Sequence, residues 1–356
     1  MNLAELGAID CDVHPGLPNM SPLAPYLDDH WRESIETRGI KAVDSNAYPL
    51  NAPLTARPDW RGANGLAAAD PAAIRRDLLD RFGIRHAILN PLSGFQLIFD
   101  EYMASAFTAA LNDWIRREWL DADPALRAAI VLPMQSAEAA VAEIERLAPD
   151  RRFVQVMVLA QGEVPLGRRS WWPVWRAAEK HDLPVAIHAG SAYRHPVTSI
   201  GWPNTYAEDY AAQSQAFQAQ LTSLITEGVF AEFPGLKVVL VESGVSWLPA
   251  YLWRLGKFWR GLRSEVPWVD RPPHEVVREH VRLTMQPLDT PDDPALIARL
   301  IEHLRSDDLL LFASDYPHWQ FDGDDVVPAG LPAGLLPKIA VDNALATYPR
   351  LREMPS

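Results

Sequence analysis

Residues 309–319 read LLLFASDYPHW, an apolar run that stops at an acid and is followed by a proline and a histidine. Near the other end of the chain, residues 8–15 read AIDCDVHP and repeat this plan. A carboxylate at the exit of a buried strand is costly unless something pairs with it. Both segments therefore predict a strand that delivers metal-ligand side chains at its C-terminal end. Because they are the first and last such segments, they predict a barrel that closes on itself with a metal in its mouth.

Further apolar runs lie between these two segments. Most of them are continuous and lack the alternation of a half-exposed strand, which is typical of parallel strands covered on both faces. The eight expected strands are 7–13, 87–90, 129–133, 153–159, 184–188, 237–242, 281–285 and 309–314.

Amphipathic segments alternate with these strands. Two of them begin with an acid at the N-cap and a proline at the first helical position, Asp70-Pro71 and Asp293-Pro294. The eight expected helices are 71–82, 101–120, 137–147, 171–181, 210–230, 247–262, 294–304 and 335–347. This alternation predicts an α/β fold, a (β/α)8 TIM barrel that spans residues 1–356 as one domain. An open doubly wound sheet is the alternative, and the lack of a Gly-x-Gly-x-x-Gly motif after the first strand weakens it.

Two segments are longer than a minimal barrel needs. Residues 38–69 predict a long loop after the first strand, and residues 191–208 predict another after the fifth. Both loops would emerge at the C-terminal face, where the active sites of such barrels lie. Loops of this length are uncommon without a function, so we expect both to cover a pocket. A plain surface insertion is the alternative, above all for the first.

Composition narrows the class of protein. Acids outnumber bases 46 to 33, and the resulting formal charge of −13 argues against a nucleic-acid partner. No apolar stretch approaches the roughly 20 residues that span a bilayer, so no membrane partner is expected. The N-terminus lacks the basic start and apolar run of a secretory signal, which predicts a cytoplasmic protein.

Four residues are candidate metal ligands. Asp12 and His14 are two positions apart on a strand, so their side chains project to the same side. His188 ends the fifth expected strand and Asp315 ends the eighth. Carboxylate oxygens and imidazole nitrogens at three strand mouths of one barrel predict a site for a divalent ion.

The chain resembles the amidohydrolase-related family, a group of metal-dependent hydrolases and decarboxylases within the amidohydrolase superfamily. The resemblance spans nearly the whole chain, and the strand 8 motif is its most specific part. The matching motifs are IDCDVH at 9–14, PVAIHAG at 184–190, EGVF at 227–230, FPGLKVV at 233–239, ESGVSWLP at 242–249, SDYPHW at 314–319 and NA at 343–344.

The resemblance implies one metal held at the positions of Asp12, His14, His188 and Asp315, with zinc as the expected ion and manganese as the alternative. It also implies a homo-oligomer, a dimer or tetramer. This chain departs from the family pattern at two places. The first motif is Asp-x-His where many relatives have His-x-His or Glu-x-His. Glu242 stands at the strand 6 position that is often a proton-moving histidine.

Three functions remain open on this evidence. The favoured one is hydrolysis of a small carbonyl compound, such as a lactone or amide, by metal-activated water, with Asp315 as the proton acceptor. The alternative is non-oxidative decarboxylation of a hydroxylated aromatic or unsaturated acid, which the replacement of a histidine by Glu242 weakens. A metal-binding barrel without catalysis is a third reading, disfavoured because no ligand is missing. Glu242 is either a second acid/base or a structural acid.

Five further residues are candidates for contacts with the substrate or with the ligands. His318 follows Asp315 in a proline turn, and we expect it to hydrogen-bond a ligand or contact substrate; capping the turn is the alternative. Arg254 could pair with an acid of the site or a substrate carboxylate, and a structural role is its default. His195, Trp202 and Tyr193 lie in the second insertion, where they could contact a planar small-molecule substrate.

Overall fold

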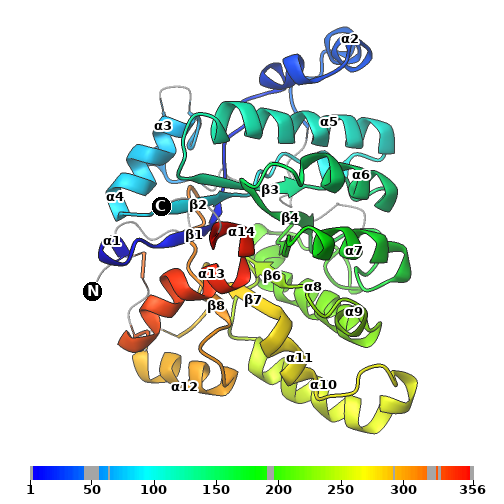
Figure 1. Cartoon of the computed structure of the whole chain (residues 1–356), viewed down its shortest axis with the longest axis vertical. Coiled ribbons are helices and arrows are strands. Elements are labelled where there is room, and N and C mark those ends of the chain that lie inside the picture. The colour runs from blue at the N-terminus through cyan, green and yellow to red at the C-terminus, as the bar shows by residue number, and fades with distance from the viewer. Residues whose placement is uncertain are drawn as a thin grey trace.

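The eight predicted parallel strands form one sheet in chain order, β1 to β8, and an isolated parallel bridge between Val13 and Tyr316 joins its two ends (Figure 1). This arrangement confirms the TIM barrel. The structure is a computed structural model that describes residues 3–43, 56–62, 65–190, 196–291, 293–318, 326–327 and 330–352. The strands are β1 (Ile9–Val13), β2 (His86–Leu89), β3 (Leu126–Val131), β4 (Phe153–Leu159), β5 (Val185–His188), β6 (Val238–Val241), β7 (Val281–Thr284) and β8 (Leu310–Leu311).

Nearly every strand residue is buried, which is the physical reason the strands read as continuous apolar runs. The last strand is shorter than the expected 309–314, because the chain leaves regular pairing after Leu311. Beyond that point individual hydrogen bonds, and no regular ladder, join the chain to β1. Cys11 N–H donates to the Phe312 carbonyl at 3.0 Å. Ser314 N–H donates to the Asp10 carboxylate at 3.1 Å. A buried side chain thus replaces part of the backbone ladder.

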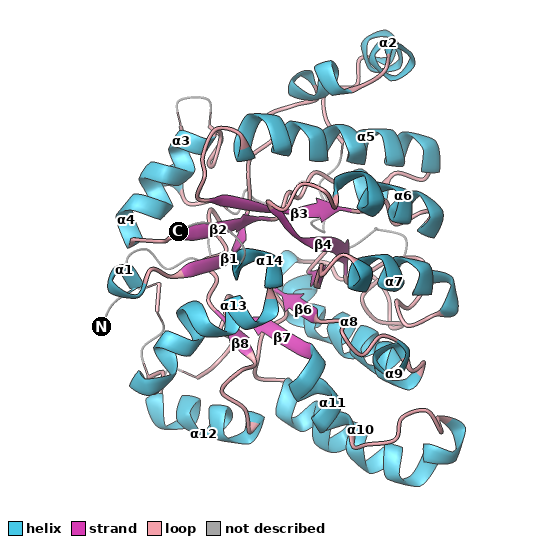
Figure 2. Cartoon of the chain, in the orientation of Figure 1, coloured by secondary structure: helices cyan, strands magenta, loops and turns pink. Residues whose placement is uncertain are grey.

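Helices surround the strands (Figure 2). They are α1 (Leu3–Leu6), α2 (Asp29–Arg38), α3 (Pro71–Ile74), α4 (Asp80–Phe82), α5 (Glu101–Trp114), α6 (Ala137–Leu147), α7 (Trp172–Lys180), α8 (Tyr206–Thr226), α9 (Val229–Glu232), α10 (Leu248–Leu262), α11 (Pro273–His280), α12 (Pro294–Leu304), α13 (Asn343–Thr347) and α14 (Pro349–Arg352). No helix in these described ranges is both long and apolar enough to cross a membrane.

Four of these helices were not predicted: α1, α2, α11 and α14. α1 and α14 have four residues each, which is too short to show a helical period. α2 buries none of its residues, so it carries no apolar stripe to detect; its N-cap Asp28 and its left-handed C-cap Gly39 set its ends. α11 has only 8 residues and begins at Pro273, the second of two consecutive prolines, a pair that is typical of a turn.

The two predicted insertions are only partly described, since residues 44–55, 63–64 and 191–195 lie outside the described residues. In the first insertion, Arg57 N–H donates to the Pro317 carbonyl at 3.3 Å, and Ala56 forms a bridge with His318. This segment therefore lies against the strand 8 motif.

The second insertion was predicted too long, because the chain becomes helical at Tyr206 and not after residue 208. Thr205 and Glu208 form a capping box that starts α8 at this point.

The C-terminal helix α14 packs beneath the barrel, opposite the strand mouths. Its Arg350 is fully buried. The guanidinium donates to the Phe153 carbonyl at 2.8 Å and to the His181 carbonyl at 2.7 Å, joining the starts of β4 and β5. A buried cation with these fixed acceptors ties the end of the chain to the sheet.

We expect Arg350→Met to lower the free energy of unfolding by about 3–5 kcal/mol, because it removes charged hydrogen bonds and leaves buried carbonyls unpaired. Thermal and urea midpoints would measure this. Arg352→Met is the matched control: Arg352 is exposed on the same helix and donates to the nearby Ala346 carbonyl. Equal midpoints for the two variants would contradict the assigned role of Arg350.

Candidate metal centre

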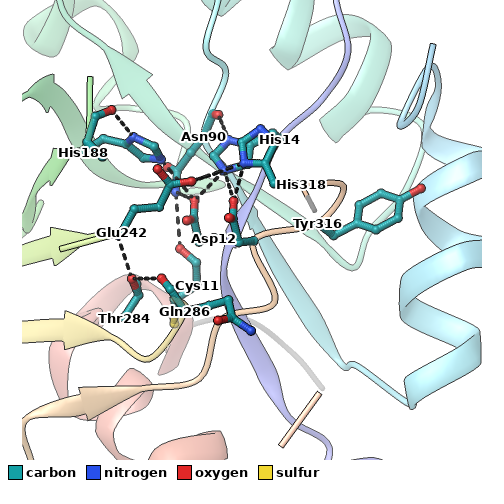
Figure 3. A network of polar contacts seen from close by, with 12 residues as sticks. Cys11, Asp12, His14, Asn90, His188, Glu242, Thr284, Gln286, Tyr316 and His318 are labelled. Carbon is teal, nitrogen blue, oxygen red and sulfur yellow. Dashed lines mark hydrogen bonds and ion pairs between the residues drawn. The ribbon is translucent and has the colours of Figure 1, made fainter. Parts of the chain in front are cut away.

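Asp12, His14, His188 and Glu242 converge at the C-terminal mouth of the barrel (Figure 3). Asp315, the fourth predicted ligand, lies beside them, with its Oδ1 3.0 Å from His14 Nε2. Single ligand atoms of Asp12, His14, His188 and Glu242 all lie within 4.8 Å of one another. A second set, joined to the first through His14 and Glu242, adds Asp315 and His318. The structure thus brings together the four ligand candidates, the acid/base candidate Glu242 and the ligand-contact candidate His318.

Both buried histidines present the same ring nitrogen to the cluster. His14 Nδ1 lies 2.8 Å from the Asn90 carbonyl, and His188 Nδ1 lies 2.7 Å from the Ala189 carbonyl. A carbonyl oxygen only accepts, so each Nδ1 carries the hydrogen. The two Nε2 atoms are thereby directed at the carboxylates: His14 Nε2 lies 3.3 Å and His188 Nε2 3.6 Å from Asp12 Oδ1. This orientation is how proteins prepare histidine to bind a metal.

Several buried polar atoms of the cluster lack a hydrogen-bond partner among the described residues. They are His188 Nε2 and one oxygen each of Asp12 and Asp315. Buried polar atoms are normally paired, so orphaned atoms in one place need an explanation. A divalent cation would satisfy the oxygens and the imidazole lone pair together, and mixed nitrogen and oxygen donors suit zinc or manganese. These residues fit a bound metal ion.

Two of the acids sit on an unusual backbone. Glu242 follows β6 with a φ of 58°, and Asp315 follows β8 with a φ of 57°. The left-handed conformation costs a residue with a side chain roughly 1–2 kcal/mol, and such strain concentrates at functional sites. The turn directs both carboxylates into the barrel mouth. Sequence alone does not reveal this conformation.

His318 lies between these two acids. Its Nδ1 is 2.5 Å from Asp315 Oδ1 and 3.2 Å from Glu242 Oε1, and its ring stacks on that of His14. The prediction of a contact with a ligand candidate matches this geometry. Burial alone would lower the pKa of His318, but the charge of Asp315 raises it to about 9. Near neutral pH the ring is therefore an imidazolium.

The pKa values of Asp315 and Glu242 are shifted in opposite directions. Burial raises the pKa of Asp315 to about 6, and the charge of Glu242 adds to the effect. Burial also disfavours the charge on Glu242, but His188 and His318 outweigh it and lower that pKa to about 2. Glu242 is therefore ionised near neutral pH, which favours a ligand or a base over a proton donor.

Asn90, at the end of β2, holds two ligand candidates at once. Its Nδ2 donates to Asp12 Oδ1 at 2.8 Å, while its carbonyl orients His14. Gln155 on β4 in turn donates to Asn90 Oδ1 at 2.8 Å. The sequence analysis missed this role, although a polar side chain ending an apolar strand was the same signal that identified Asp315.

The other predicted contact residues do not join the cluster within the described part of the chain. Arg254 is exposed on α10, with its guanidinium over the Phe258 ring, so the predicted pairing with an acid of the site is not found. Trp202 is 47% exposed. Tyr193 and His195 lie outside the described residues.

Two tyrosines at the start of α8 border the cluster instead. Burial raises the pKa of Tyr206 to about 12, with the charges of Glu242 and Asp315 contributing. Burial, with the same acids contributing, also raises the pKa of Tyr210, whose ring contacts that of Tyr206 edge-on.

Known proteins share this fold and this sequence pattern. Gamma-resorcylate decarboxylase from Rhodococcus jostii (strain RHA1) is 28% identical over 213 residues, which are 56% of this chain and 62% of that relative. The matches span between 57% and 62% of the length of the curated relatives.

Two solved structures match over almost their full lengths. An amidohydrolase from Mycobacterium avium subsp. paratuberculosis K-10 has a TM-score of 0.71 at 22% identity, covering 96% of this chain and 97% of that one. A dihydroxybenzoic acid decarboxylase from Polaromonas sp. JS666, with bound manganese and the inhibitor 2-nitroresorcinol, has a TM-score of 0.68 at 21% identity, covering 99% and 98%. At these identities the likeness establishes the fold.

The family match covers nearly the whole sequence. The family described as Amidohydrolase matches residues 9–350 of the 356, a span that begins in β1 and ends at Arg350. The chain belongs to the amidohydrolase family.

Proposed function

We propose that the protein is a metal-dependent, non-oxidative decarboxylase of hydroxylated aromatic acids. The similarity to gamma-resorcylate decarboxylases carries this proposal and reverses the preference for hydrolysis drawn from sequence. The replacement of a histidine by Glu242 weakened decarboxylation on sequence grounds. The position of His318 removes that objection, because an imidazolium beside the acids can supply the proton.

We propose one divalent ion held by Asp12, His14, His188 and Asp315, with manganese favoured over the zinc expected from sequence. The neighbouring decarboxylase from Polaromonas has manganese bound, and a carboxylate-rich donor set suits manganese. When bound, the ion would supply positive charge for the carboxylate and hydroxyl oxygens of the substrate. The homo-oligomer expected from the resemblance stays a prediction.

In the proposed reaction the bond between the ring carbon and the carboxylate breaks, CO2 leaves, and the ring carbon takes up one proton. His318 is the proton donor, since Asp315 and Glu242 occupy its Nδ1 and leave Nε2 to act on substrate. Its side chain is 19% exposed, so it can regain a proton from solvent after each turnover. Asp315 uses one oxygen to hold His318 and keeps the other for the ion.

Hydrolysis would use a base in the same place, and the ionised carboxylate of Glu242 could serve as one. The preference for decarboxylation therefore rests on the similarity to the gamma-resorcylate decarboxylases.

The purified enzyme loaded with Mn²⁺ should release CO2 from 2,6-dihydroxybenzoate, and a chelator should abolish this until Mn²⁺ is restored. Benzoate is the matched control, because it lacks the hydroxyl groups that would bind beside the carboxylate. A coupled CO2 assay and chromatography of the aromatic product would follow the reaction. Release of acid from lactones or amides without CO2 from any hydroxybenzoate would contradict the proposal.

His318→Gln should lower kcat by about 10²–10⁴-fold, the usual contribution of a general acid, with little change in metal content. Asp315→Asn should abolish turnover and also weaken metal binding, because Asp315 has both roles. Steady-state kinetics and metal analysis of each variant separate these effects. A kcat for His318→Gln within threefold of the native value would remove its role as proton donor.

Metal binding should release protons at neutral pH. In the metal-free protein burial opposes protonation of His14 and His188, but nearby carboxylates prevail and raise both pKa values. Each Nε2 must lose its proton to bind the ion, so the apparent affinity should rise as pH increases from 6 to 8. Calorimetry in buffers of different ionisation enthalpy would count the protons. An affinity independent of pH in this range would contradict the assignment of the two histidines.

A further inference from the structure

We infer that Glu242 is itself a ligand of the divalent ion, a fifth protein donor contributed by β6. This inference rests on the proposed metal centre and extends it. The evidence is the position of the carboxylate, the backbone that holds it, and the charge of the cluster.

The carboxylate lies at coordination distance from the other donors. Glu242 Oε1 is 3.8 Å from His14 Nε2, and its ligand atom is within 4.8 Å of those of Asp12 and His188. Donors about 2.1 Å from one ion lie roughly 3–4 Å from each other. The side chain is 7% exposed, so the groups around it, His318 among them, must stabilise its charge. His188 Nε2, buried and without a hydrogen-bond partner among the described residues, is directed into the same space.

The backbone of Glu242 repeats that of an expected ligand. Glu242 and Asp315 share the left-handed conformation immediately after their strands. The Glu242 N–H also donates to Thr284 Oγ1 at 3.1 Å, which fixes the turn from the neighbouring β7. A conformation that costs free energy at two acids facing one point indicates that both are directed there for the same purpose.

Three carboxylates, those of Asp12, Glu242 and Asp315, meet in one buried cluster. Buried charges are stable only when they are paired or coordinated, so this concentration of negative charge favours one ion that contacts all three acids.

Glu242 would complete a set of three oxygen and two nitrogen donors. Zinc is satisfied by four protein ligands, whereas a six-coordinate ion such as Mn²⁺ uses a fifth donor and an open position. Removal of Glu242 should therefore weaken Mn²⁺ binding more than Zn²⁺ binding.

The test is metal titration of the apo full-length protein, with free Mn²⁺ counted by its EPR signal and Zn²⁺ by competition with a chelating dye. Glu242→Gln keeps the shape of the side chain and removes its charge. We expect its Mn²⁺ affinity to fall by about 10–100-fold and its Zn²⁺ affinity to fall less. Glu143→Gln is the matched control, because Glu143 is a buried acid of α6 that pairs with Arg146 and Asn112. Circular dichroism checks that each variant is folded.

Asp12→Asn separates failure of this inference from failure of the metal centre. If Asp12→Asn loses Mn²⁺ while Glu242→Gln binds it within threefold of the native protein, Glu242 is not a ligand and the proposed centre stands. If the native protein binds neither ion, both proposals fail. If Glu242→Gln lowers the affinities for Mn²⁺ and Zn²⁺ equally, Glu242 does not act as the fifth donor that a six-coordinate ion would use.

Discussion

Three carboxylates buried together at the barrel mouth impose the constraint on which the site depends. Asp12, Glu242 and Asp315 belong to one cluster whose other members are histidines. Mutual repulsion in a buried space would protonate or expel such acids unless positive charge lies among them. In the metal-free protein protons on the histidines supply that charge, and in the proposed enzyme a metal ion replaces part of it. Proton release on metal binding and proton delivery to substrate then arise from the same electrostatic requirement.

The barrel frame meets this requirement with backbone groups. Main-chain carbonyls of Asn90 and Ala189 select the tautomer of the two ligand histidines, and left-handed turns orient two of the acids. These devices belong to rigid strand ends, so the donors are placed before any ion arrives. Preorganisation of this kind reduces the free-energy cost of forming the site.

Much of the fold was predictable, since strands buried on both faces are continuous apolar runs and Asp70 and Asp293 cap their helices as expected. Asp12, His14, His188 and Asp315 were predictable because each ends such a run. Glu242 and His318 were also candidates, but their direct contact was not predictable, because it depends on a positive φ at Glu242 and on the approach of the segments that follow β6 and β8. The extent of the second loop was misjudged because Tyr206 resembles a loop residue until Thr205 is recognised as a cap.

The seam between the first and last strands has a consequence for synthesis on the ribosome. The hydrogen bond from Ser314 N–H to the Asp10 carboxylate joins residues 304 positions apart in sequence. The cluster contains residues that follow both the first and the last strand. Contacts so distant in sequence form late, since the entropy of closing the loop must be overcome first. A nascent chain that has emerged only as far as β7 holds four of the six cluster residues and lacks Asp315 and His318. The full donor set is therefore complete only in a molecule that has closed its barrel.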